Sequence, residues 1–157
     1  MRIAIGSDHR GLKMKWKAME LLRTNEDQEV VDCFPLESNV AIDYPDVASK
    51  VAQMVSSGEA DRGVLICGTG IGMCIVANKY PGVRAAVCSD ELTAEISRRH
   101  NNLNILCLSG DMLGDQALQN VLHTWIVTEF EGKRHETRLE KIAQIEGENM
   151  KCSCPSN

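Results

Sequence analysis

The sequence lacks several features that would assign it to a class at once. No apolar run approaches the roughly 18 residues of a membrane-spanning helix, and Arg2 leads directly into "IAIG" with no secretory signal pattern. Positive charge is also scarce: 17 lysines and arginines stand against 22 aspartates and glutamates, a formal net charge of −5. This balance disfavours non-specific binding to nucleic acid or to an acidic membrane. We expect a cytoplasmic protein without a nucleic-acid or membrane partner.

The seven cysteines are an odd number, spread along the chain and mostly within apolar runs. Such usage favours free thiols in a reducing compartment over a disulfide framework. The closely spaced pair Cys152 and Cys154 has no neighbouring histidine to complete a metal site of three or four ligands. At 157 residues the chain suits one domain. We predict that domain over residues 1–148 and a disordered tail over 149–157.

Short apolar runs alternate with amphipathic stretches along the domain. Five apolar runs predict strands covered on both faces: residues 2–6, 29–33, 63–67, 84–88 and 104–108. Six amphipathic stretches predict helices, with bounds uncertain by a few residues: 9–22, 45–57, 72–79, 91–100, 113–126 and from 133 onward. The apolar face of the first stretch is formed by Leu12, Trp16, Met19 and Leu22, and the inward face of the last by Leu139, Ile142 and Ile145. The alternation predicts an α/β fold, with a five-stranded parallel sheet and helices on both faces.

Ligands of open parallel sheets bind beyond the carboxyl ends of the strands, and the loop "GTGIG" follows the third predicted strand there. Gly68, Gly70 and Gly72 allow positive φ and a close approach of the backbone to a ligand. The loop N–H groups and the following helix start would present positive partial charge to a phosphate or to a reaction oxyanion. A tight turn without a ligand is the simpler alternative, but it needs fewer glycines.

Cys67 ends the strand directly before this loop. A helix N-terminus lowers the pKa of a nearby thiol, and Thr69 could donate a hydrogen bond to the thiolate or to a substrate. However, Cys33 and Cys88 also end strands and Cys107 lies within one, and buried strand cysteines are usually inert. Cys67 therefore stands out by its place beside the glycines.

Other candidate side chains lie in separate motifs. In "GSDHRG", an N-cap role explains either Ser7 or Asp8 but not His9. His100 follows a helix, where a lone histidine is more simply a cap than a catalyst. Arg134 and Arg138 stand four residues apart, so they form either a phosphate clamp or a solvated basic face. Together with the glycine loop, these residues fit proton abstraction beside a carbonyl of a phosphorylated substrate, with N–H groups stabilising an enediolate.

A dinucleotide-binding domain is the main rival from the motifs. "GSDHRG" has glycines at both ends, and Asp32 ends the second strand where a ribose-binding acid would lie. Asp8 replaces the middle glycine, where it would repel a pyrophosphate, and Met73 breaks the pattern in "GTGIGM". No Gly-Lys-Ser/Thr follows, so the loop is not a Walker loop. A non-catalytic sensor of phosphorylated sugars fits the same motifs as an enzyme that abstracts a proton from such a substrate.

Five motifs occur in one order along residues 2–145: "GSDHRG", "DYP", "ICGTGIGMCIVANK", "RRHNNLN" and "EFEGKRH". Together they resemble type B ribose-5-phosphate isomerases, which are grouped with galactose-6-phosphate isomerase subunits and allose-6-phosphate isomerases. The resemblance implies a Rossmann-like three-layer sandwich that needs no metal or cofactor and interconverts ribose 5-phosphate and ribulose 5-phosphate through an enediolate. It also implies a homodimer whose active site is shared between chains, with assembly into a tetramer left open.

The resemblance assigns a role to each matching residue. Cys67 would be the base that moves the proton between C1 and C2. His100, assisted by Asp8, would open the sugar ring. The remaining residues would bind the substrate: Thr69 with the backbone of Gly68, Gly70, Ile71 and Gly72 in the anion hole, His9, Arg134 and Arg138 at the phosphate, and Tyr44 and Asn101 at the sugar.

The chain departs from the family in the loop after the fifth strand. Many relatives carry a phosphate-binding arginine there, whereas "LSGDMLG" has Asp111. An acid cannot hold a phosphate directly, so Asp111 would cap the next helix, or Lys133 would compensate. The departure keeps a six-carbon sugar phosphate, allose 6-phosphate or galactose 6-phosphate, as the alternative substrate. The galactose enzymes fit less well because one of their two subunits lacks the usual thiol, whereas this chain has both Cys67 and His100.

Overall fold

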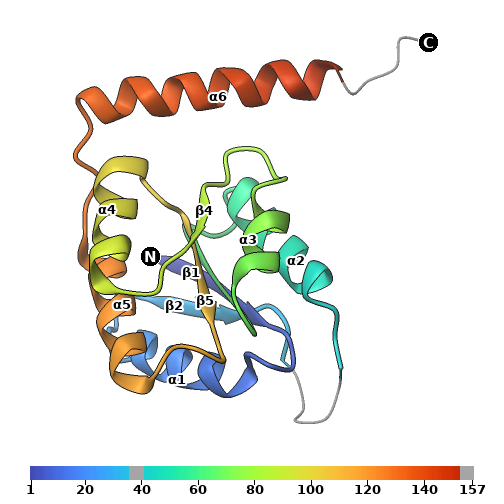
Figure 1. The fold of residues 1–157 in the computed structure, drawn as a ribbon, viewed down its shortest axis with the longest axis vertical. Helices are drawn as coiled ribbons and strands as arrows, with labels where there is room; N and C mark the ends of the chain where they lie inside the picture. The colour runs from blue at the N-terminus through green and yellow to red at the C-terminus, as the bar shows by residue number, and fades with distance from the viewer. Residues whose placement is uncertain (36–40, 153–157) are drawn as a thin grey trace.

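The computed structural model describes residues 1–35 and 41–152 (Figure 1). In this part of the chain five strands form one sheet in the order β2-β1-β3-β5-β4, and every neighbouring pair is parallel. The strands are β1 (Arg2–Ser7), β2 (Glu29–Asp32), β3 (Arg62–Cys67), β4 (Ala85–Val87) and β5 (Ile105–Ser109). The parallel five-stranded sheet predicted from the sequence is therefore confirmed.

Helices cover both faces of this sheet, as expected. They are α1 (Leu12–Arg23), α2 (Tyr44–Ser56), α3 (Ile71–Ala77), α4 (Glu91–Asn101), α5 (Asp115–Val127) and α6 (Arg134–Cys152). Alternate strand residues point to opposite faces: Ile66 packs in the core with α1, α4 and α5, whereas Leu65 and Cys67 pack in the core with α2 and α3. Cys67 therefore faces the α3 side of the sheet.

The largest departures from the predicted elements are in the helices. Helix α1 begins at Leu12 rather than near His9, because the Asp8 side chain accepts the N–H groups of Arg10 and Gly11 in a turn before it, at 2.9 and 3.0 Å. The inward placement of Trp16 is wrong, since the residue is 50% exposed. No helix within the described residues is long and apolar enough to cross a membrane.

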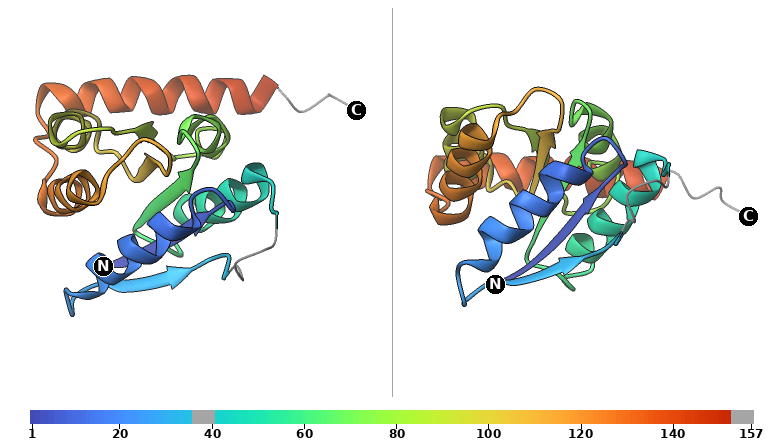
Figure 2. Two further views of the ribbon diagram at one scale, coloured as in Figure 1. Left: turned by 60° about the horizontal axis from the view of Figure 1, so that its bottom comes forward. Right: turned by 90° about the horizontal axis from the view of Figure 1, so that it is seen from below.

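Helix α6 runs across one end of the molecule (Figures 1 and 2). It continues to Cys152, so the expected boundary at residue 148 falls inside a helix, and the rest of the expected tail, including Cys154, lies outside the described residues. The inward placement of Ile142 and Ile145 is wrong for a single chain, because they are 49% and 58% exposed. Helix α6 contacts α4, and farther along it the Glu146 carboxylate accepts the Gly82 N–H at 2.8 Å.

The cysteines whose side chains the structure describes are all free thiols: Cys33, Cys67, Cys74, Cys88 and Cys107. This confirms the expectation of free thiols for those five.

Candidate active site

The glycine loop holds the Cys67 thiol at the end of β3. Cys67 is 6% exposed, and its sulfur accepts a hydrogen bond from the Gly70 N–H at 3.1 Å. The loop turns back at Gly70, which has φ 77° and precedes α3. A Cβ built at Gly70 would lie 3.1 Å from the Leu108 carbonyl oxygen. Glycine is needed here both for the left-handed backbone and for the close approach of β5.

Residues at the end of β5 and in the loop after it form hydrogen bonds with the glycine loop. The Gly110 N–H donates to the Cys67 carbonyl at 2.7 Å, and the Ser109 hydroxyl donates to the Gly68 carbonyl at 2.7 Å. These bonds engage the carbonyl groups on one side of the turn. The Thr69 hydroxyl, which is exposed, accepts the Ile71 N–H at 3.3 Å. The strand end and its turn thus form a rigid support for the thiol.

Tyr44 closes one side of this loop from the start of α2. Its ring packs against Gly72, where an added Cβ would lie 2.6 Å from the Tyr44 Cε2 atom. Tyr44 remains 41% exposed. The structure therefore brings together the thiol, the glycines and the tyrosine that the sequence assigned to the site.

Asp8 and His9 follow β1 at the same edge of the sheet. Asp8 is 6% exposed, its N–H donates to the Ile66 carbonyl at 3.2 Å, and its Oδ1 holds the turn before α1. The N-cap of α1 is Gly11, without a side-chain cap bond, so the expected capping role of Asp8 is replaced by these bonds in the preceding turn, and His9 is exposed beside it. Asp8 fixes the shape of the loop that presents His9.

Asp111 does not cap the next helix as expected. The residue before α5 is Gly114, with no side-chain cap, and Asp111 instead forms an ion pair with Arg10 from the loop after β1. Arg10 was not among the predicted site residues, because nothing in the sequence joins two residues that are 101 positions apart. Two loops flanking the glycine loop are therefore linked by opposite charges.

A second cluster gathers around His100 in the last turn of α4. The His100 ring stacks on His135 of α6, with centroids 4.2 Å apart and planes 7° from parallel. Asn102, in the left-handed conformation with φ 45°, provides the C-cap of α4, so His100 is not needed for that role. The Arg134 Nε donates to the His135 Nε2 at 3.3 Å. Arg134 and His100 thus meet through a histidine that sequence reasoning missed.

His135 is 2% exposed. Burial lowers its pKa, and the nearby charges of His100, Arg134 and Arg138 lower it further. A neutral imidazole is consistent with its accepting role toward Arg134. Arg138 is exposed one turn along α6. The first turns of α6 therefore present two exposed arginines beside a buried histidine.

His100, Glu131 and His135 are the group of described residues best placed to hold a metal ion, with ligand atoms within 4.8 Å of one another. Glu131 is already paired with Arg99. Two nearly parallel stacked rings keep their lone pairs in separate planes, so both cannot point at one ion without turning. The arrangement suits a stacked pair better than a metal centre.

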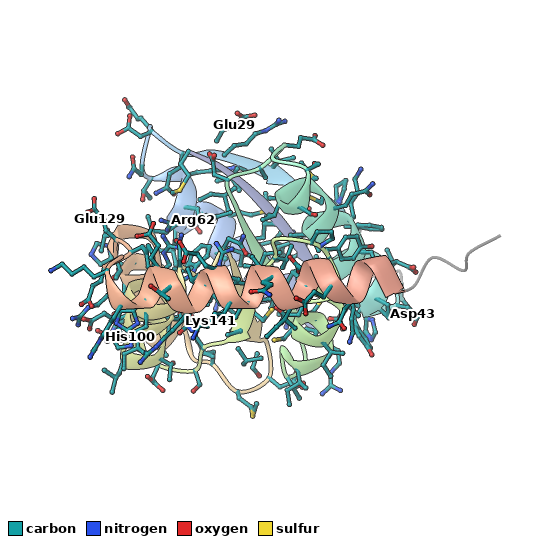
Figure 3. The ribbon with its side chains drawn as sticks, turned by 90° about the horizontal axis from the view of Figure 1, so that it is seen from above. Glu29, Asp43, Arg62, His100, Glu129 and Lys141 are labelled. Atoms are coloured by element: carbon teal, nitrogen blue, oxygen red, sulfur yellow. The ribbon has the colours of Figure 1, made fainter. Side chains whose placement is uncertain are left out.

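The end of β3 with its glycine loop lies at one end of the folded molecule, and the end of α4 with the start of α6 lies at the other (Figure 1). Helix α4 returns toward the amino ends of the strands, where its Asn101 carbonyl accepts the Nε of Arg84, the residue before β4, at 3.1 Å. Cys67 ends β3 at the carboxyl edge. In the view from above, Figure 3 labels His100 and Asp43, the residue before Tyr44, on opposite sides of the molecule. One chain therefore does not bring His100, Asn101, Arg134 and Arg138 to the thiol.

The structure also bears on the dinucleotide alternative. Both carboxylate oxygens of Asp32 accept hydrogen bonds from Lys15 Nζ at 2.9 Å, and Oδ1 also accepts the Phe34 N–H at 3.1 Å. Lys15 is 0% exposed. Asp32 is thus used to fasten α1 to β2 and is not available to bind a ribose.

Comparison with known proteins decides between the remaining alternatives. A sequence model described as Ribose/Galactose Isomerase matches residues 3–142. The chain belongs to this isomerase family. It is 41% identical to ribose-5-phosphate isomerase B of Escherichia coli over 145 residues, which are 92% of this chain and 96% of the relative. The expectation of an isomerase is therefore confirmed, and the non-catalytic sensor and the nucleotide-binding module are not favoured.

Solved structures of relatives share the fold of this isomerase. Ribose-5-phosphate isomerase B of Clostridium thermocellum is 46% identical, with a TM-score of 0.90 over 95% of this chain and 99% of that chain. The Mycoplasma genitalium enzyme, solved with bound ribulose 5-phosphate, is 42% identical, with a TM-score of 0.89 over 94% of this chain and 97% of that chain. The Rossmann-like three-layer sandwich is thus confirmed.

Proposed function

We propose that this isomerase interconverts ribose 5-phosphate and ribulose 5-phosphate in the cytoplasm, with Cys67 as the base. The observation that carries the proposal is the Cys67 thiol held at the glycine loop by the Gly70 N–H at 3.1 Å. The bound ribulose 5-phosphate of the Mycoplasma genitalium relative supports the choice of substrate. Allose 6-phosphate is the alternative, because its isomerisation would use the same groups.

In the proposed reaction the Cys67 thiolate removes the proton from C2 of the open-chain aldose. The electrons of the C–H bond form the C1–C2 double bond of an enediolate, and the carbonyl oxygen on C1 takes up the negative charge. Backbone N–H groups of the loop other than those of Gly70 and Ile71, which are bonded within the loop, stabilise that charge, because preorganised donors act where charge develops. Return of the proton to C1, with a proton shift from O2 to O1, completes the ketose. No redox partner is needed.

The other predicted residues complete the site in this scheme. His100 opens the sugar ring with help from Asp8, Tyr44 and Asn101 contact the sugar, and the phosphate is held by His9, Arg134 and Arg138. Because one chain separates the thiol from His100, we infer that a second chain supplies the His100 cluster. The exposed Ile142 and Ile145 of α6 support this, since a second copy would cover them. The unit would be a homodimer, with a tetramer as a further step.

The first experiment compares the wild type with Cys67→Ala in an assay for ribulose 5-phosphate, with allose 6-phosphate in parallel. We expect turnover of ribose 5-phosphate by the wild type and loss of turnover, with retained substrate binding, in the variant. Near-normal turnover by Cys67→Ala would contradict its role as the base. Faster turnover of allose 6-phosphate would move the assignment to the alternative substrate.

A mixing experiment tests the shared site. Cys67→Ala and His100→Asn are each expected to be nearly inactive. When the two chains are co-expressed, half of the dimers are mixed and each holds one intact site, so about a quarter of wild-type activity should return. Absence of any recovery, with mixed dimers demonstrated by native mass spectrometry, would place the thiol and the histidine of a site on one chain.

A further inference from the structure

Arg10 and Asp111 form a charged bridge over the glycine loop. Arg10 comes from the loop after β1 and Asp111 from the loop after β5, and these strands are the two neighbours of β3. The Arg10 Nη2 is paired with the Asp111 Oδ2. A Cβ built at Gly68 would lie 3.0 Å from both the Arg10 Nε and the Asp111 Oδ2. The guanidinium therefore packs directly on the loop backbone, where a side chain at position 68 would displace it.

The bridge leaves most of the guanidinium fork unused. Within the described residues, Nη2 is the Arg10 guanidinium nitrogen that forms a hydrogen bond, whereas Nε and Nη1 have none. The Arg10 side chain is 60% exposed. A guanidinium presents five donors in a planar fork and binds phosphate oxygens in pairs. A fork anchored at one nitrogen, with the others free, is oriented for an anion at small further cost in side-chain entropy.

The carboxylate of Asp111 at this edge of the sheet needs a neighbouring cation if a phosphate is to bind there. Asp111 alone would place a carboxylate beside the loop proposed to receive a phosphorylated substrate, and like charges repel. The arginines expected to hold the phosphate, Arg134 and Arg138, lie at the other end of the folded molecule, away from the glycine loop of their own chain. Arg10 directly follows His9, itself a predicted phosphate ligand. The guanidinium thus provides an arginine on the thiol-bearing chain itself.

We propose that Arg10, oriented by Asp111, binds the phosphate group of the substrate at the glycine loop. This rests on the proposed function and adds to it a residue that the predicted site did not contain. Asp111 then acts as a positioning residue, so that the acid in the loop after β5 serves phosphate binding through its partner.

The test measures the kinetics of ribose 5-phosphate turnover and the binding of inorganic phosphate by calorimetry. For Arg10→Gln we expect the KM and the Kd for phosphate to rise about tenfold, the value of one charge-assisted hydrogen bond, while kcat changes less than threefold. Lys17→Gln is the matched control, because Lys17 forms an exposed pair with Asp115 on the neighbouring helices, and it should leave both constants within twofold. An unchanged KM and Kd, or a fall in kcat alone, would overturn the proposal.

An exchange variant separates the position of the charge from its presence. Arg10→Asp places two acids at the loop and should weaken phosphate binding more than Arg10→Gln. The double variant Arg10→Asp with Asp111→Arg restores the pair with its ends exchanged, and we expect it to recover at least half of the lost affinity on a logarithmic scale. No recovery would overturn the role of the pair. Phosphate calorimetry does not require turnover, so this result stays distinct from failure of the isomerase proposal.

Discussion

Gly70→Ala is expected to damage both the stability and the activity of the protein. Gly70 has φ 77°, and a left-handed backbone costs a residue with a Cβ roughly 1–2 kcal/mol. The new Cβ would also lie 3.1, 3.2 and 3.3 Å from the Leu108 carbonyl oxygen, carbonyl carbon and amide nitrogen. Backbone of a central strand cannot give way cheaply, so overpacking adds about 1–3 kcal/mol. We expect a total loss of about 2–5 kcal/mol in the free energy of unfolding.

Gly58→Ala is the matched control for this prediction. Gly58 also has φ 77°, but an added Cβ there has no atom within 4 Å. It should therefore carry the conformational cost alone, with a fall in Tm of about 2–8 °C against roughly 4–20 °C for Gly70→Ala. Gly58→Ala should also keep the wild-type kcat.

The loss of activity follows from the hydrogen bond between the Gly70 N–H and the Cys67 sulfur. A displacement of about 1 Å at a reacting group can cost on the order of 100-fold in rate, and we expect a fall of that size in kcat for Gly70→Ala. Calorimetric melting and steady-state kinetics measure the two effects. Equal Tm values for the two alanine variants, with an intact kcat at position 70, would refute the reasoning.

Three further predictions concern buried groups. Lys15→Met should lower the free energy of unfolding by about 3–5 kcal/mol in urea titrations, because it leaves the Asp32 carboxylate without its cation. Adding Asp32→Asn should recover part of this loss. A hydrogen bond from Cys107 lowers the pKa of Cys74 to about 7. The rate at which iodoacetamide alkylates the protein should therefore rise with pH around that value. The same reaction in Cys74→Ser would show that another thiol is responsible. The lowered pKa of His135 means that the unfolded chain binds more protons below about pH 6.5, so stability should fall there, and His135→Phe should weaken this dependence.

The site shows which parts of a function can be inferred from local sequence. The glycine loop and Cys67 were predictable because strand, turn and helix are consecutive in the chain, and the loop after a parallel strand must lie at the carboxyl edge. Tyr44 was assigned through the family resemblance alone, and the structure adds that its ring packs against Gly72. His135 was missed because a histidine between charged residues at a helix start carries no signal of its own.

The sequence by itself determined the class of the fold and the identity of most candidate groups. Apolar runs of strand length and amphipathic stretches of helix length are local properties, so the five strands and the six helices could be predicted from them. The odd and scattered cysteines likewise indicated free thiols.

Only the tertiary structure decided the strand order, the Arg10–Asp111 bridge and the separation of Cys67 from His100. Each depends on residues far apart in the chain, whose partners are chosen by packing rather than by neighbours in sequence. The exposure of Ile142 is a further case, because periodicity shows which helix face is apolar but not what covers it. In the described part of this chain Ile142 and Ile145 of α6 remain about half exposed, which the periodicity alone did not indicate.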